Sequence, residues 1–161
     1  MNPHTEISNF LDQESYNKLK EFLNNKNTPW YTREGAPSVD WILFTHYFHD
    51  NFVPQSQGWP LIFPILEKLK CKGVIQVRAN LTFKKEKRYE GDWHTDYEPT
   101  NKTAILYFTT CDGYTLLDRK KQYQIKAEEN KLLIFPGDME HRLVSQLDTE
   151  KRTVFNINYY N

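Results

Sequence analysis

The sequence predicts a mainly β (α+β) protein, a double-stranded β-helix or jelly roll with supporting helices in its N-terminal half. From Gly73 onward, short runs of β-branched and aromatic residues recur between turn residues, which is the spacing of a sandwich or barrel. Before that point, two stretches show helical spacing. The chain has 161 residues, which fits one domain over 1–161, with 1–72 as helical and strand support and 73–161 as the jelly-roll core.

The first element is an amphipathic helix that ends at Asn24, with Asp12 as a plausible N-cap. Its apolar residues follow helical spacing, namely Tyr16, Leu19, Phe22 and Leu23. Residues 30–33 and 39–48 are predicted strands around a turn at Gly35 to Pro37. Residues 49–59 are a predicted loop. A second helix over 61–69 is opened by Pro60, and Pro64 either weakens this helix or marks its first turn.

The C-terminal half is predicted to be made of strands. They lie at 74–83, 92–97, 103–110, 113–117, 121–126, 131–135, 140–145 and 152–160. On the first of these, Arg78, Asn80 and Thr82 alternate with apolar residues, so this strand has one polar face and one apolar face. Such a face lines a site or faces water, and the pattern alone leaves both open.

The charge balance bears on the partners of the protein, and the cysteine content indicates a reducing compartment. Lys+Arg and Asp+Glu are both 21 and the pI is about 7.0, which disfavours nucleic acid and anionic membranes as partners. Cys71 and Cys111 have neither metal-type spacing nor a disulfide framework. The sequence shows no signal peptide and no apolar run of about 20 residues. We therefore expect a cytoplasmic protein without a membrane segment; its oligomeric state is left open.

A metal site is predicted from three side chains. In Gly91-Asp92-Trp93-His94-Thr95-Asp96-Tyr97, a His and an Asp two residues apart share a face of a strand. His141 lies 45 residues after Asp96 (141 − 96) and follows a Pro-Gly-Asp turn. His94, Asp96 and His141 together match the two-His-one-carboxylate triad of non-haem Fe(II) oxygenases. A bare His-x-Asp is a weak signal, and its alternative is a surface His beside a solvated Asp.

The chain resembles the Fe(II)/2-oxoglutarate-dependent dioxygenases, and within them the prolyl-4-hydroxylase-like branch. The likeness covers residues 73–160, and the motifs that carry it are Ile75 to Asn80, Tyr89 to Asp96, Leu133 to His141, and Arg152. It implies that His94, Asp96 and His141 bind Fe(II) and that 2-oxoglutarate chelates this iron.

The resemblance also implies a basic residue that binds the far carboxylate of 2-oxoglutarate. Arg152, 11 residues after His141 (152 − 141), has the expected position, and a guanidinium binds a carboxylate bidentately. Many relatives have Ser or Thr two residues later, where this chain has Val154. Prolyl-hydroxylase-like relatives have a Tyr on the strand after the His-x-Asp strand, so the resemblance implies that Tyr107 supplies the second hydrogen bond, with a core tyrosine as its alternative. Asn80 is a third candidate for co-substrate binding.

Two other patterns are interpreted as structural. His46 and His49 would point to opposite faces of a regular strand and could not share a metal ion. The basic run 84–88 could guide an anionic substrate, but such runs are more often solvated loop tips.

The resemblance implies an oxygenase that converts 2-oxoglutarate and O2 to succinate and CO2 while it hydroxylates a substrate. Ascorbate is a further candidate cofactor. Asp96 favours hydroxylation, because halogenating relatives have a small residue at the carboxylate position. The substrate is expected to be peptidyl (prolyl-like) or a small amino-acid-type molecule. The rival interpretation is a non-catalytic jelly-roll module that binds a sugar or peptide; such a module needs neither Arg152 nor the paired histidines.

Overall fold

The computed structural model describes residues 3–32, 43–97 and 100–161, and the predicted turn at 35–37 lies outside these ranges. The larger sheet has eight strands, in the order β1-β9-β6-β11-β5-β3-β2, with β4 paired to β3. Its members are β1 (Thr5–Ile7), β2 (Tyr31–Thr32), β3 (Leu43–Asp50), β4 (Val53–Pro54), β5 (Gly73–Phe83), β6 (Lys102–Tyr107), β9 (Leu132–Pro136) and β11 (Lys151–Tyr160).

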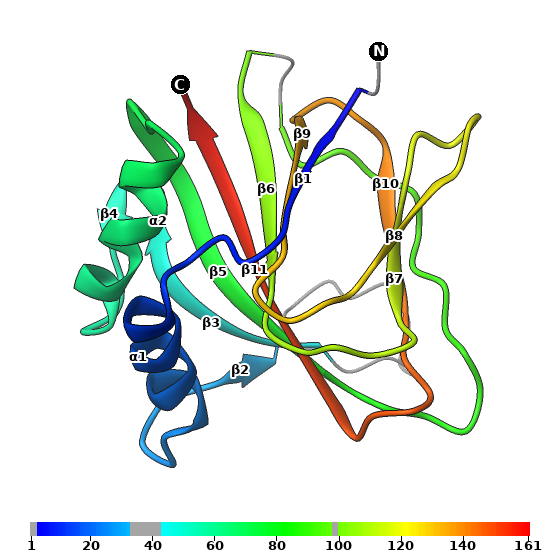
Figure 1. The fold of residues 1–161 in the computed structure, drawn as a ribbon, viewed down its shortest axis with the longest axis horizontal. Coiled ribbons are helices and arrows are strands. Elements are labelled where there is room, and N and C mark those ends of the chain that lie inside the picture. The colour runs from blue at the N-terminus through cyan, green and yellow to red at the C-terminus, as the bar shows by residue number, and fades with distance from the viewer. Residues whose placement is uncertain (1–2, 33–42, 98–99) are drawn as a thin grey trace.

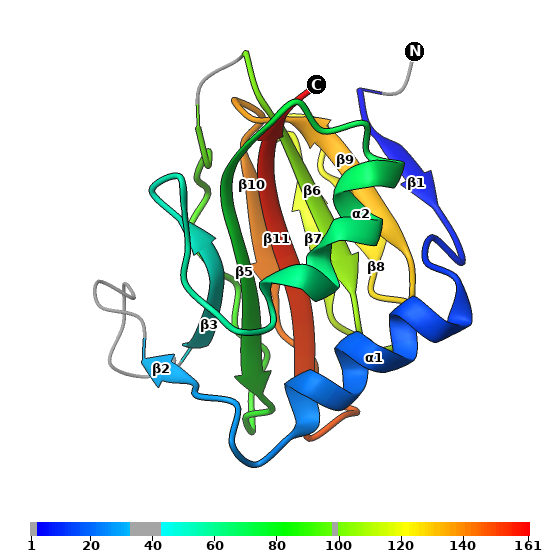
Figure 2. The ribbon, with the colours of Figure 1, turned by 90° about the vertical axis from the view of Figure 1, so that its left-hand side faces the viewer.

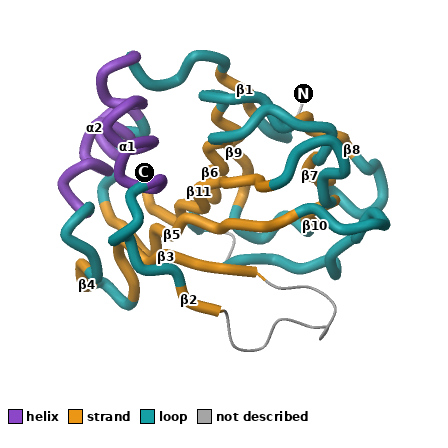
Figure 3. Tube along the Cα trace, turned by 90° about the horizontal axis from the view of Figure 1, so that it is seen from below, coloured by secondary structure: helices purple, strands orange, loops and turns teal. Residues whose placement is uncertain are grey.

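A smaller sheet has the order β10-β7-β8, and its strand pairs are antiparallel. It consists of β7 (Tyr114–Leu117), β8 (Tyr123–Lys126) and β10 (His141–Val144). The two sheets face each other, and the helices lie on the outer face of the larger one (Figures 1 and 3). The arrangement is the two-sheet jelly roll that the sequence predicts, with helices as a third layer.

The helices pack side by side across the larger sheet (Figure 2). Helix α1 (Gln13–Asn24) is capped by Asp12, whose side chain accepts a hydrogen bond from the Ser15 backbone amide at 2.9 Å, as predicted. The second predicted helix is a 3-10 turn η1 (Trp59–Ile62) followed by α2 (Phe63–Lys68), with Pro64 in its first turn. Among the described residues, no helix has the length and apolar character needed to cross a membrane.

Side chains along the central strands point alternately to the two faces of the larger sheet, and each face has its own hydrophobic cluster. Ala104 and Leu106 of β6 face the helices, whereas Ile105 and Tyr107 face the smaller sheet. On β11, Phe155, Ile157 and Tyr159 belong to the helix-side cluster. The even-numbered residues of β11 from Arg152 to Asn158 and of β5 from Gln76 to Thr82 therefore point between the two sheets. The space between the sheets receives polar side chains from both strands, and it is here that a site can form.

Three local predictions differ from the structure. Residues 92–97 contain no regular strand, and only an isolated bridge joins His94 to His141. Short strands occur at β1 and β4, where no strand was predicted. Both strands have only two or three residues, too few for a periodic signal, and long-range pairing with β9 and β3 sets them.

A bulge in β3 corrects the prediction for its histidines. His46 is opposite Ala79 and His49 is opposite Val77, so Phe48 is an extra residue between them. Because both partners face the helices, both histidines do so as well, and the prediction of opposite faces is wrong. Each has a packing role: the ring nitrogens of His46 lie 2.7 Å from the Pro29 carbonyl oxygen and 2.8 Å from Ser56 Oγ, and the His49 ring stacks near Trp59.

Candidate metal and co-substrate site

The predicted metal ligands converge between the sheets. One ligand atom from each of His94, Asp96 and His141 lies within 4.8 Å of the others. His94 Nε2 lies 3.9 Å from Asp96 Oδ1, and His141 Nε2 lies 3.7 Å from Asp96 Oδ2. Ligands at right angles around a first-row metal with bonds of about 2.1 Å are about 3.0 Å apart, so the two His–Asp distances exceed this spacing by less than about 1 Å. Over the described residues, this is the one cluster of its kind.

The histidine tautomers suit metal binding. His94 Nδ1 lies 3.0 Å from the carbonyl oxygen of Asp92, and His141 Nδ1 lies 3.1 Å from that of Met139. A carbonyl oxygen only accepts hydrogen bonds, so each Nδ1 carries the proton and donates it. Each Nε2 is then left with its lone pair directed toward Asp96. This arrangement is the usual outer support of a metal-binding histidine.

The protonation states agree with this assignment. Burial is the largest influence on His141 and lowers its pKa below the ordinary 6.5, and Asp96 only partly offsets the effect. Burial alone would raise the pKa of Asp96, but His141, Arg78, His94 and a hydrogen bond from Asn156 together lower it below the ordinary 3.8. A neutral imidazole and an ionised carboxylate are the forms in which these residues bind metal.

Asp96 and His141 are buried, whereas 49 % of the His94 side chain is exposed. The metal site therefore opens to solvent on the His94 side.

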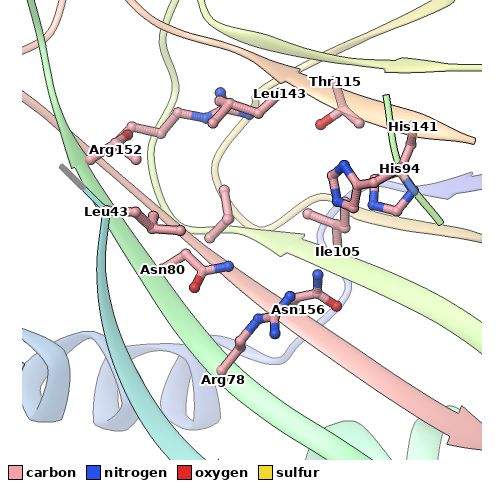
Figure 4. A pocket seen from close by; sticks show the side chains of 12 residues that line it. Leu43, Arg78, Asn80, His94, Ile105, Thr115, His141, Leu143, Arg152 and Asn156 are labelled. Carbon is pink, nitrogen blue, oxygen red and sulfur yellow. The ribbon is translucent and has the colours of Figure 1, made fainter. Parts of the chain in front are cut away.

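A cavity of about 120 Å³ extends from the histidines between the two sheets (Figure 4). Its polar lining comes from Arg78, Asn80, Thr82, His94, Thr115, His141, Arg152 and Asn156, and its apolar lining from Leu43, Ile105, Leu143 and Val154. The polar face of β5 thus lines a site rather than facing water. The cavity is smaller than the roughly 300–1,000 Å³ of drug-sized pockets, so it suits a small co-substrate.

Arg152 lies at the end of this cavity away from the histidines (Figure 4). It is 3 % exposed, and its Nη1 donates to the Val144 carbonyl oxygen at 3.0 Å. In the described part of the chain, no carboxylate lies within ion-pair distance of it, and its buried Nε has no hydrogen-bond partner. Burial lowers the pKa of this guanidinium. A buried cation without an anion is costly, so the geometry fits a site for a carboxylate from outside the chain.

Tyr107 lies next to Arg152 but does not line the cavity directly. Its ring centre is 5.8 Å from the Arg152 guanidinium carbon, and its hydroxyl is 2.8 Å from Thr115 Oγ1. Thr115 does line the cavity, with its oxygen toward the interior in Figure 4. Sequence reasoning missed Thr115, because only the pairing of β7 with β10 brings it to the cavity.

The basic run 84–88 is interpreted as a loop tip rather than as a guide for an anionic substrate, and its contacts are with neighbouring loops. Arg88 forms an ion pair with Asp112 and donates to the carbonyl oxygen of Ser145 at 2.8 Å. Lys84 pairs with Glu150. Both residues bind the loop at 84–88 to neighbouring loops, and neither residue lines the cavity.

Comparison with known proteins supports the fold. No protein-family model matches the sequence, and no curated protein sequence matches it. Among solved structures, a prolyl hydroxylase from Trichoplax adhaerens, in complex with a hypoxia inducible factor peptide fragment, is 16 % identical with a TM-score of 0.72. That match covers 99 % of this chain and 84 % of the other.

Two bacterial structures are similar as well. A 2OG-Fe(II) oxygenase family oxidoreductase from Burkholderia pseudomallei has 8 % identity and a TM-score of 0.72, over 98 % of this chain and 85 % of the other. A prolyl-4-hydroxylase from Pseudomonas putida has 11 % identity and a TM-score of 0.66, over 99 % and 93 %. At these identities the likeness establishes the fold, which is the jelly roll of the 2OG-Fe(II) oxygenases.

Proposed function

We propose that this protein is a non-haem Fe(II)- and 2-oxoglutarate-dependent dioxygenase that hydroxylates its substrate and releases succinate and CO2. The observation that carries the proposal is the pairing of two features in one cavity. A two-His-one-carboxylate triad lies at one end, and a buried arginine without a carboxylate partner in the described chain lies at the other. A non-catalytic sugar- or peptide-binding module would need neither feature.

Each residue has a defined part in this proposal. His94 and His141 offer Nε2 lone pairs and Asp96 offers a carboxylate oxygen to Fe(II), which leaves three further positions on the ion for other ligands. When bound, the iron supplies oxidative chemistry with 2-oxoglutarate and O2. Arg152 binds the far carboxylate of 2-oxoglutarate, because a guanidinium remains charged when it is desolvated.

Other residues that line or adjoin the cavity hold the co-substrate and exclude water. Thr115 and Tyr107 provide hydroxyls beside Arg152, and Asn80 provides an amide along the cavity. The apolar side chains of Ile105, Leu143 and Val154 surround the middle of a bound dicarboxylate. Ascorbate is a further candidate, as a reductant that maintains ferrous iron.

For the substrate we propose a peptidyl (prolyl-like) or small amino-acid-type molecule. The small cavity is taken up by 2-oxoglutarate, so the substrate approaches from the exposed side of His94. The Trichoplax adhaerens prolyl hydroxylase is in complex with a peptide fragment, which is in line with an extended peptide at such an opening.

A turnover assay tests the proposal. The protein is incubated in air with Fe(II), ascorbate and 2-oxoglutarate, with and without a panel of proline-containing peptides, and succinate is measured by NMR. We expect wild type to form succinate and His141→Ala to form none. Equal succinate formation by the two proteins, or none by either under any condition, would contradict the proposal.

A further inference from the structure

Two buried asparagines on β11, Asn156 and Asn158, have not been assigned a part in co-substrate binding. They alternate with Phe155 and Ile157, and they are 6 % and 0 % exposed. Asparagine is depleted in strands, and a buried amide without partners costs free energy. Asn-x-Asn in the centre of a sheet therefore calls for a network that satisfies both amides.

The network is a chain of hydrogen bonds that runs in one direction to the carboxylate of Asp96. Thr103 Oγ1, fully buried on β6, donates to Asn158 Oδ1 at 2.8 Å. Asn158 Nδ2 donates to Asn156 Oδ1 at 3.1 Å, and Asn156 Nδ2 donates to Asp96 Oδ2 at 3.2 Å. Each amide thus accepts at its oxygen and donates at its nitrogen, which fixes the orientation of both.

The network starts in the centre of the larger sheet. Thr103 and Asn158 are directly opposite each other in the β6–β11 ladder, near the middle of the larger sheet. Asp96, in contrast, belongs to a segment without regular strand pairing. An isolated bridge at His94 holds this segment, together with a hydrogen bond of 3.3 Å from the Tyr97 amide to the Gly137 carbonyl oxygen. The loop therefore cannot by itself define the rotation of the Asp96 carboxylate. Two side chains of the larger sheet, Asn156 and Thr103, lie within hydrogen-bond distance of that carboxylate.

We propose that the Thr103–Asn158–Asn156 relay positions the Asp96 carboxylate for metal binding. Asn156 donates to Asp96, and Asn158 acts through Asn156. Thr103 acts through both asparagines, and its Oγ1 also lies 3.4 Å from Asp96 Oδ2. This inference rests on the proposed function, because it takes Asp96 as a metal ligand.

The chemistry of the donor favours this role. A second group also lies beside Asp96: Arg78 Nη2 is 3.8 Å from Oδ1, and Arg78 Nη1 donates to Gln76 Oε1 at 2.5 Å. Both Arg78 and Asn156 stabilise an ionised carboxylate, but the charge of Arg78 repels a divalent cation that binds there. The amide of Asn156 is neutral, so it can hold the carboxylate in place with the metal present.

Cobalt(II) binding to the protein tests the relay without any turnover. Visible absorbance titrations give the affinity, and the d–d bands report the geometry around the ion. Partners of metal ligands are typically worth about 10- to 100-fold in metal affinity. We expect Asn156→Leu to weaken cobalt(II) binding by about that factor and to shift the bands. Asn158→Leu should have a smaller effect in the same direction.

The matched control is Asn80→Leu, which removes an amide that lines the same cavity but bonds with Thr45 rather than with Asp96. Its cobalt(II) affinity should equal that of wild type. The double variant Asn156→Leu/Asn158→Leu should bind no more weakly than Asn156→Leu, because groups that act in series do not add. If Asn156→Leu fails to fold, as judged by circular dichroism, Thr103→Val and Asn158→Leu are compared in its place.

Two results separate the relay from the metal site itself. If His94→Ala abolishes cobalt(II) binding while the relay variants bind with wild-type affinity and spectrum, the relay is refuted and the metal site stands. If His94→Ala binds as well as wild type, the proposed function fails, and the relay fails with it.

Discussion

His94 and His141 form a reciprocal backbone pair: each amide donates to the carbonyl oxygen of the other, at 3.1 and 2.9 Å. This bridge sets the two imidazole rings 4.4 Å apart by their centroids, although 47 residues (141 − 94) separate them in the chain. Two hydrogen bonds in an otherwise irregular segment thus join the loop that carries Asp96 to the smaller sheet. The metal site depends on this contact between sheet and loop.

Replacing Arg152 by methionine should remove most of the affinity for 2-oxoglutarate. Hydrogen bonds to charged groups contribute about 1.5–3 kcal/mol, so Arg152→Met should weaken 2-oxoglutarate binding by about 10- to 150-fold. Isothermal titration with the cobalt(II)-loaded protein measures this. Cobalt(II) affinity serves as the control and should be unchanged; an unaltered 2-oxoglutarate affinity would place the co-substrate elsewhere.

Removing the hydroxyl of Tyr107 should have a smaller effect in the same direction. It forms a single neutral hydrogen bond with Thr115, and such bonds contribute about 0.5–1.5 kcal/mol. We therefore expect Tyr107→Phe to weaken 2-oxoglutarate binding by about 2- to 12-fold. Thr115→Val should do the same, because it removes the hydroxyl that lines the cavity. If both variants bind like wild type, these hydroxyls do not serve the co-substrate.

Gly113 has no side chain, and this leaves space for the guanidinium of Arg152. A Cβ at this position would lie 3.2 Å from Arg152 Nη1, and 3.0 and 3.1 Å from backbone atoms of Gln146 and Val144. The backbone atoms cannot move aside easily, so Gly113→Ala should destabilise the protein by about 1–3 kcal/mol and weaken 2-oxoglutarate binding. Denaturant unfolding measures the first effect. Gly73→Ala is the control, since its Cβ would meet only Tyr160 at 3.4 Å or more; equal stability of both variants would refute the crowding.

Acid should destabilise the metal-free protein through His46. Burial, partly offset by the hydrogen bond to Pro29, lowers its pKa below the ordinary 6.5. A histidine whose pKa is lowered by folding gives its full stabilisation of the folded state at pH values above its pKa in the unfolded chain. This stabilisation is lost as the pH falls toward the pKa of the histidine in the folded protein. Thermal melts between pH 7.5 and 5 should therefore show falling stability below about 6.5. In the His46→Asn variant, the melting temperature should fall less steeply with decreasing pH. A slope identical to that of wild type would exclude His46 as a cause.

Much of the site could be predicted from local motifs. His94, Asp96 and His141 come together as the sequence predicts, and Arg152 lines the same cavity. The reason given for the first pair was wrong, because residues 92–97 are not a regular strand. The backbone bridge to His141, and not strand alternation, brings these ligands together.

The rest of the site depends on pairing between distant strands. Thr103 and Asn158 meet through the β6–β11 register, and Gly113 meets Arg152 through the path of a loop. Neither relationship leaves a periodic pattern in the sequence. The bulge at Phe48 could not be predicted either. One extra residue places His49 on the face of the sheet opposite to the one that regular alternation predicts, and no Gly or Pro marks the position in the sequence.

The central claim is that the three ligands and Arg152 hold Fe(II) and 2-oxoglutarate in one cavity. Anaerobic addition of both to the protein tests it most directly, because the chelate has a weak visible metal-to-ligand charge-transfer band. We predict the band for wild type, its absence for His94→Ala, and its formation only at higher 2-oxoglutarate concentration for Arg152→Met. No band in wild type, with equal iron affinity in wild type and His94→Ala, would contradict the claim.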